Sequence, residues 1–146
     1  MKSILVSIAL ALSAVGCTHP ATMSAPAGFG RVDGSYDYRA VNPQGVVVAA
    51  RSEKNDPKSD LGFWASAVDL KLARKGYSRT ASTDVKSTDG LPGRLMKYDT
   101  GSGNVYWIAV FATDAKVLVS EATGWKTDME ASSKQIEASL LSARVN

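Results

Sequence analysis

Cysteine and histidine occur once each in this chain of 146 residues, as Cys17 and His19, with a single threonine between them. These two residue types supply the commonest nucleophile–base pairs and zinc ligands, so their use limits the chemistry open to the chain. The residues before Cys17 indicate a different use for its sulfur.

The segment before Cys17 has the pattern of an export signal. Lys2 gives it a positive start, and residues 4–15 form an apolar run interrupted only by two serines. A run of about 12 residues is too short for a transmembrane helix, which needs roughly 20, and suits the hydrophobic part of a cleaved signal. The residues Ala14-Val15-Gly16-Cys17 that end it resemble the bacterial lipoprotein box, which is cut just before the cysteine. We therefore expect residues 1–16 to be a lipoprotein signal peptide.

The resemblance implies that Cys17 is the site of lipidation. Its sulfur would carry diacylglycerol and its freed amine an acyl chain such as palmitate, and several chains together give stable membrane attachment. The next residue is Thr18 rather than an aspartate associated with inner-membrane retention. We therefore expect the outer membrane, facing the periplasm, in a host with two membranes, and the cell surface otherwise. The alternative is an ordinary secreted protein with one free thiol, a liability in an oxidising compartment. His19 is then linker sequence, and we expect no metal site there.

Without Cys17 and His19, the rest of the chain has a thin catalytic inventory. It contains no Gly-x-Ser-x-Gly elbow, no Ser-x-x-Lys motif and no phosphate loop. Acidic residues group loosely in two places, at Asp56, Asp60 and Asp69 and at Asp128 and Glu130. A carboxylate-based hydrolase could use a pair of them, but favourable charge near helix N-termini is the simpler explanation. We expect a protein that is not an enzyme and needs no cofactor.

A basic cluster at the end of the first predicted helix offers a candidate contact surface. Its members are Lys71, Arg74, Lys75 and Arg79, with Tyr77 among them. They could contact anionic lipid headgroups, peptidoglycan or an acidic protein, although cations at a helix C-terminus are also stabilising by themselves. Trp125, just before the last predicted helix, is a further candidate contact or else packs over the start of that helix.

The composition indicates one modestly basic domain. Removal of residues 1–16 leaves 130 residues, enough for a single core, and lowers the formal net charge from +3 to +2. This charge is too small to indicate nucleic acid as a partner. Residues 17–34 are rich in alanine, glycine, proline and small polar residues, and predict a flexible tether. Its glycines lack the spacing and the preceding strand of a dinucleotide-binding loop.

Residues 35–146 predict a single α+β domain that opens with a hairpin. Residues 35–41 alternate, a turn follows at Asn42-Pro43-Gln44-Gly45, and a second strand begins at Val46. Apolar residues then recur at helical spacing over 61–75, with Asp60 as the N-cap and Gly76 as the end.

A strand meander and a second helix complete the domain. A weak edge strand is expected near residues 83–87, and three more strands at 93–99, 105–112 and 116–122. The strand over 105–112 is apolar on both faces and should be central, with Tyr106 and Trp107 in the core on opposite faces. Thr127 and Glu130 have the spacing of a capping box for the last helix. The apolar face of that helix comprises Met129, Ile136, Leu140 and Ala143.

This order of elements favours an antiparallel or mixed sheet flanked by two helices. The arrangement resembles the PsbP and DcrB-like fold over residues 35–145. The resemblance is carried by "YDYRAVNPQGVVVAA", by the helix that holds Phe63 and Trp64, by "GRLMKYDTGSGNVYWIAVFATDAKVLVSEATG" and by the last helix. It implies a PsbP-like sandwich and an accessory or binding role, and it supplies no shared catalytic residues.

The expected function is that of a non-catalytic lipoprotein of the cell envelope, an accessory or binding module for an envelope protein or a cell-wall partner. Two alternatives stay open at this point. One is a carrier that holds a small apolar ligand between helix and sheet, and the other is the carboxylate-based hydrolase.

Overall fold

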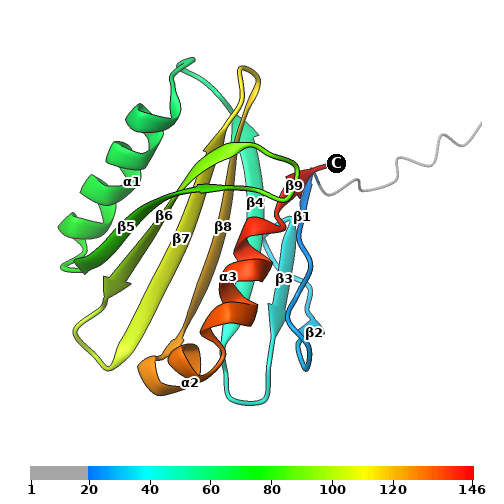
Figure 1. The fold of residues 1–146 in the computed structure, drawn as a ribbon, viewed down its shortest axis with the longest axis vertical. Coiled ribbons are helices and arrows are strands. Elements are labelled where there is room, and N and C mark those ends of the chain that lie inside the picture. The colour runs from blue at the N-terminus through cyan, green and yellow to red at the C-terminus, as the bar shows by residue number, and fades with distance from the viewer. Residues whose placement is uncertain (1–19) are drawn as a thin grey trace, which may run out of the picture.

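A seven-stranded antiparallel sheet forms the centre of the protein (Figure 1). The computed structural model describes residues 20–146. The strands lie in the order β2-β3-β4-β8-β7-β6-β5, and a separate antiparallel pair joins β1 to β9. The strands are β1 (Ala21–Thr22), β2 (Gly30–Arg31), β3 (Tyr38–Val41), β4 (Val47–Lys54), β5 (Ser78–Lys86), β6 (Pro92–Asp99), β7 (Asn104–Ala112), β8 (Lys116–Trp125) and β9 (Arg144–Val145). The helices are α1 (Leu61–Arg74), α2 (Lys126–Ala131) and α3 (Ser133–Leu141).

Helices pack on both faces of the sheet. α2 and α3 lie on one face, mainly over β8, and bury a core that includes Trp107 and Leu118. α1 lies on the other face over β5, β6 and β7, and buries a second core that includes Leu72 and Met96. Figure 1 shows α1 on one side of the strands and α3 on the other. The expected α+β class, an antiparallel sheet flanked by helices, is confirmed.

The alternation of residues along β7 supplies both cores. Trp107 and Phe111 belong to the core under α3, whereas Ile108 and Val110 belong to the core under α1. The strand is thus covered on both faces, as its apolar sequence predicted. Tyr106 and Trp107 point to opposite faces as expected, but only Trp107 is fully buried, whereas Tyr106 is half-buried because it borders an open groove.

α1 begins and ends at the residues that signal its limits. Oδ1 of Asp60 accepts a hydrogen bond from the Phe63 backbone N–H at 2.8 Å, which satisfies one of the unpaired amides of the first turn. Gly76 follows the helix with a φ of 88°, a conformation that glycine adopts without strain and that stops the helix. The predicted helix over 61–75 is confirmed, with its last helical residue at Arg74.

Asn55 ties the start of α1 to the end of the sheet. Its Nδ2 group donates to the carbonyls of Ser59 at 2.9 Å and Thr113 at 2.8 Å. Its Oδ1 accepts from the Ser59 backbone N–H at 3.0 Å and from Nε1 of Trp64 at 2.7 Å. The side chain is buried with its hydrogen-bonding capacity filled, so it fixes where α1 crosses the sheet.

The predicted tether over residues 17–34 is wrong from residue 20 onward. Ala21 pairs with Val145 in the β1–β9 ladder, and Met23 is buried in the core under α3. β2 adds a further short strand to the edge of the sheet beside β3. Each of these contacts involves only one or two consecutive residues, so the sequence shows no alternating pattern that would indicate a strand. The predicted signal peptide and Cys17 lie outside the described residues.

Two predictions from the second half of the chain also need correction. β5 spans Ser78–Lys86 rather than residues 83–87, since this polar edge strand needs no apolar face. The last helix begins at Lys126 and breaks at Ser132 into α2 and α3, and Thr127 makes no capping bond. The predicted apolar face of this helix is confirmed, because Met129, Ile136, Leu140 and Ala143 are all buried.

Candidate functional site

An open groove lies on the α1 face of the sheet, beside the part that α1 covers. α1 packs mainly against β5, β6 and β7 and also covers Val117 and Val119 at the start of β8, whereas the same face around Glu121 and Thr123 of β8 and Ala49 of β4 is open. The space there measures about 460 Å³ and adjoins a second space of about 220 Å³ along α1. We call the two together the tyrosine groove; both are lined by Tyr36, Tyr77, Tyr106 and Glu121.

The side chains on the floor of the tyrosine groove form two rows that run across the strands, and the register of the strands determines which residues share a row. One row crosses β3, β4 and β8 through Arg39, Ala49 and Glu121, which are successive cross-strand partners. The neighbouring row passes through Thr123 on β8 and its partner Tyr106 on β7. Alternation along each strand puts all of these side chains on the α1 face. Residues distant in the chain therefore meet because antiparallel pairing aligns them.

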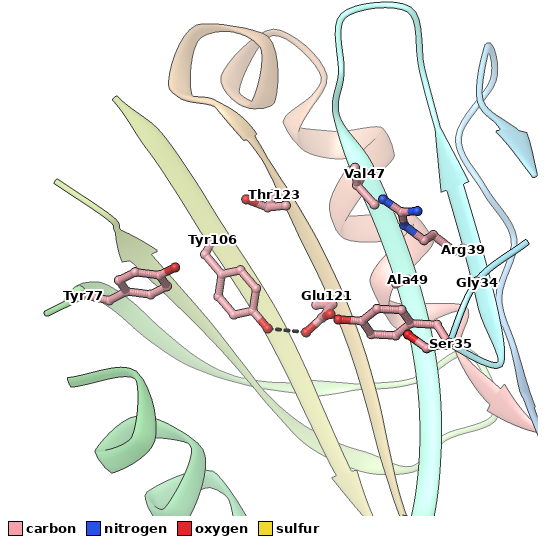
Figure 2. A pocket seen from close by; sticks show the side chains of 10 residues that line it. Gly34, Ser35, Arg39, Val47, Ala49, Tyr77, Tyr106, Glu121 and Thr123 are labelled. Carbon is pink, nitrogen blue, oxygen red and sulfur yellow. Dashed lines mark hydrogen bonds between the residues drawn. The ribbon is translucent and has the colours of Figure 1, made fainter. Parts of the chain in front are cut away.

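Glu121 is the buried acceptor at the centre of this floor. The residue is only 9% exposed, and its Oε2 atom accepts a hydrogen bond from the Tyr106 hydroxyl (Figure 2). The Tyr36 hydroxyl also hydrogen bonds to this carboxylate. Nη1 of Arg51 lies 3.8 Å from Oε2 and supplies a positive charge. Two hydroxyls and a guanidinium therefore compensate a carboxylate that would otherwise be costly to bury.

The two tyrosines are held in their neutral, hydrogen-donating form. Burial is the main cause that raises the pKa of Tyr106, and the negative charge of Glu121 adds to it. For Tyr36 the hydrogen bond to Glu121 is the main cause of a raised pKa, followed by burial. Both phenols therefore remain protonated donors at neutral pH.

Positive side chains border the tyrosine groove on two sides. Arg39 lines it from β3, and Lys71 and Lys75 line it from α1. Figure 2 shows Arg39 at one end of the row of lining residues and Tyr77 at the other. Among the ion pairs of the described residues, none involves these three cations, whereas Arg51 is shared between Glu121 and Glu53.

The structure separates the basic cluster predicted at the end of α1. Lys71, Lys75 and Tyr77 line the tyrosine groove, whereas Arg74 is exposed and does not. Arg79 instead points its Nη1 to Oδ2 of Asp69 at 3.1 Å. Of the four cations in the predicted cluster, only Lys71 and Lys75 therefore line the site.

Trp125 is the other predicted contact residue, and it lies outside the tyrosine groove. Its side chain is 55% exposed, and its ring covers the glycine of the β6–β7 turn, where a Cβ added to Gly103 would come within 2.7 Å. It therefore packs on a neighbouring turn and keeps an exposed aromatic surface. Cys17, the predicted lipidation site, lies before the first described residue.

Most of the groove residues carry no signal in the sequence that singles them out. The set that was not singled out comprises Tyr36, Arg39, Arg51 and Glu121. One signal was available: Glu121 interrupts the apolar run of β8, where a charged residue on a covered strand needs partners. Nothing in the sequence showed that those partners would come from β4, β7 and the segment just before β3.

The acidic residues proposed for a hydrolase do not meet in a cleft. Asp60 caps α1, Asp69 accepts the Tyr98 hydroxyl at 2.7 Å, and Glu130 lies 3.9 Å from Nζ of Lys126. Within residues 20–146, no three His, Cys, Asp or Glu side chains are grouped so that they could hold a metal ion. No described helix has the length and apolar character to cross a membrane.

Comparison with known proteins identifies the fold. The solution structure of the cyanobacterial PsbP protein (CyanoP) from Synechocystis sp. PCC 6803 matches with a TM-score of 0.59, over 97% of this chain and 99% of that one. The chain has a PsbP-like fold. The two sequences are 11% identical, so this likeness concerns the fold alone. No family model matches the chain, and no curated protein matches it. The expected PsbP-like sandwich is thus confirmed as a fold, and it supplies no residue roles for the tyrosine groove.

Proposed function

We propose that this PsbP-like protein is a non-catalytic lipoprotein of the cell envelope, anchored through Cys17, that binds a ligand or an envelope partner in the tyrosine groove. The main support for the binding role is the Glu121 carboxylate, which lies on the floor of an open groove and whose charge is offset by Tyr106 and Arg51. Charged residues are rarely buried unless they are paired, as Glu121 is, and a concave surface with a few converging polar groups is typical of a binding site.

The lining of the groove argues for binding rather than hydrolysis. Glu121 is the only carboxylate that lines either part of the groove among the described residues, and it is already engaged by two tyrosines and Arg51. A glycosidase of the common type needs a second carboxylate across the cleft. A role without catalysis is the function that these contacts support best.

The alternative of an apolar carrier receives no support from the packing. Leu72, Met96 and Ile108 fill the space between α1 and the central strands. A smaller opening of about 210 Å³ remains between α1 and β8, and Arg51, Glu53, Lys54 and Lys71 border it. The tyrosine groove combines charged and hydroxyl-bearing side chains with two small apolar ones, Val47 and Ala49. A hydrophobic molecule would gain little there, because polar groups would lose water without new partners.

The anchor is tested on the mature protein purified from its own membranes. We expect mass spectrometry to find a chain that begins at Cys17 and carries diacylglycerol and an acyl group. Labelled palmitate should enter the natural protein and not a Cys17→Ser variant. A mature chain with an unmodified Cys17 thiol would contradict the anchor and leave the binding role to be judged separately.

The binding role is tested by crosslinking in intact cells. A photoreactive amino acid at position 77 lines the tyrosine groove, and the same group at the exposed Gln135 on α3 serves as the matched control. We expect a defined adduct from position 77 that position 135 does not give. Enrichment of nothing beyond the lipoprotein-sorting machinery, or the same products from both positions, would count against a binding groove.

A further inference from the structure

The hydrogen-bonding groups of the tyrosine groove are unequally satisfied. Its buried acceptor, Glu121, already receives two tyrosine hydroxyls and the charge of Arg51. The Thr123 hydroxyl is also used, since it donates to the Val105 carbonyl at 3.0 Å. The donors at the border, by contrast, form no ion pair among the described residues. An occupant therefore meets spare donors rather than spare acceptors.

The spare donors border the two adjoining spaces of the groove: Arg39 lines the larger one and the two lysines line the smaller one, with Glu121 between them. Arg39 on β3 lies in the same row as Ile108 on β7, three strand intervals away, which is roughly 14 Å at about 4.8 Å per interval. α1 lies over β7 and brings Lys71 and Lys75 to that side. Long arginine and lysine side chains can reach inward from both sides toward an anionic group over Glu121, which lines both spaces.

We infer that the ligand of the tyrosine groove is a small molecule carrying carboxylate or phosphate groups, held between Arg39 on one side and Lys71 and Lys75 on the other. This inference rests on the proposed binding function and names its ligand class. The larger space, about 460 Å³, is of the size that small-molecule sites have. The rings of Tyr77 and Tyr106, whose centroids are 6.1 Å apart, give the uncharged part of such a ligand a surface to pack against.

The charges of the groove support an anionic ligand in spite of Glu121. Arg39, Lys71 and Lys75 supply three positive charges, and Arg51 balances the carboxylate. Tyr36 and Tyr106 also direct their hydroxyl hydrogens to Glu121, so the carboxylate is screened from an occupant. An anion therefore meets a net positive surface at close range.

The test is calorimetric titration of the full chain, purified in a neutral detergent, at fixed ionic strength. The probes are citrate for carboxylates, pyrophosphate for phosphates and glucose as a neutral control. We expect one equivalent of citrate or pyrophosphate to bind. The probe that binds more tightly shows whether the charged groups of the natural ligand are carboxylates or phosphates. Hydrogen exchange should slow around residues 34–39 and 71–77 when that probe is bound.

Charge-removing variants locate the site. Lys71→Gln and Arg39→Gln should each weaken binding of the anion by about tenfold, the effect of losing one charged hydrogen bond. Lys134→Gln on α3, an exposed lysine outside the groove, is the matched control and should bind as the natural protein does. Because Lys71 is exposed on α1, its variant will fold, and thermal unfolding verifies this for Arg39→Gln.

Three outcomes would overturn the inference. Glucose binding without anion binding would mean a neutral ligand, while the proposed binding function would stand. Equal weakening by Lys134→Gln would mean attraction by general surface charge. Absence of saturable binding by either anion would remove the ligand class, and crosslinking at position 77 would then decide separately on the binding function.

Discussion

The Tyr106 hydroxyl donates a hydrogen bond to a carboxylate that is almost inaccessible to solvent, that of Glu121 on the neighbouring strand. The two residues are diagonal neighbours across β7 and β8, since Tyr106 pairs with Thr123 and Glu121 pairs with Ile108. This diagonal spacing lets a long aromatic side chain reach the carboxylate. The pair therefore links the stability of the sheet to the floor of the tyrosine groove.

Tyr106→Phe should lower the free energy of unfolding by about 1–3 kcal/mol at pH 7, because the buried carboxylate loses one of its donors. Chemical denaturation measures this loss. Tyr38→Phe is the matched control, since the Tyr38 ring stacks under Arg31 at 5.1 Å and its hydroxyl makes no hydrogen bond to Glu121. Equal stability of the natural protein and the Tyr106→Phe variant would show that the bond contributes nothing net.

The same pair should make the protein sensitive to alkali. Burial and the charge of Glu121 raise the pKa of Tyr106 above its ordinary value of about 10, which the unfolded chain retains. The stabilisation is thus complete below about pH 10 and is lost as the pH rises above it, because only the unfolded chain then releases the proton. In Tyr106→Phe the decline of stability above pH 10 should be shallower, by up to about 1.4 kcal/mol per pH unit. Denaturation midpoints at closely spaced alkaline pH values give these slopes, and identical slopes would contradict the prediction.

Asn55→Ala should destabilise the protein by about 2–4 kcal/mol. The substitution removes four hydrogen bonds at a residue only 8% exposed and leaves Nε1 of Trp64 and the Thr113 carbonyl without their partner. Gln135→Ala on the exposed surface of α3 is the control and should change stability by less than about 0.5 kcal/mol. A thermal melt that shows the same midpoint for both variants would mean that Asn55 does not position α1.

Gly93→Ala should also destabilise the protein, by about 1–3 kcal/mol, because of overpacking. A Cβ at this buried position in β6 would lie 2.4 Å from the ring of Phe111 and 3.0 Å from the Val110 carbonyl oxygen. Phe111 is itself fully buried, so its ring would have to repack within the core to make room. Gly30→Ala, where a Cβ would meet open space, is the matched control and should be close to neutral in chemical denaturation. Equal midpoints would indicate that the Phe111 ring can move aside.

Deleting the segment up to residue 34 should cost much more than deleting residues 1–19. The longer deletion removes β1, β2 and the side chain of Met23, which is 5% exposed. Loss of one buried methionine alone costs about 2–5 kcal/mol, so the shorter chain should unfold at a clearly lower denaturant concentration. Equal midpoints for the two truncated proteins would mean that the folded domain begins at residue 35, as the sequence predicted.

The sequence predicted elements best where one residue pattern ran long enough. β7 was recognisable from its apolar run, and α1 from its spacing, its Asp60 cap and Gly76. β1 was not, because two residues show no period and its partner β9 lies at the other end of the chain. The break at Ser132 was also missed, since the apolar residues on either side of it still share one face.

The tyrosine groove was harder to predict than the fold. Lys71, Lys75 and Tyr77 could be singled out because they are close in sequence. Arg39, Glu121 and Tyr106 come from three strands, and their proximity depends on the register of β3, β4, β8 and β7. A single sequence shows which faces are apolar, but it does not show which strands become neighbours.

If Cys17 carries the lipid that we propose, the contacts between the two ends of the described chain limit how far the domain can lie from the membrane. The Asn146 backbone N–H donates to the Pro20 carbonyl at 2.9 Å, and Ala21 is already fixed in the β1–β9 ladder. With the lipid we propose on Cys17, four residue steps remain before Ala21, a reach of at most about 14 Å. The domain is then kept against the bilayer near β1 and β9, which lie along one side of the molecule, while α2 and the β3–β4 turn lie farther away at its lower end (Figure 1). Any partner would have to come to the membrane surface to meet it.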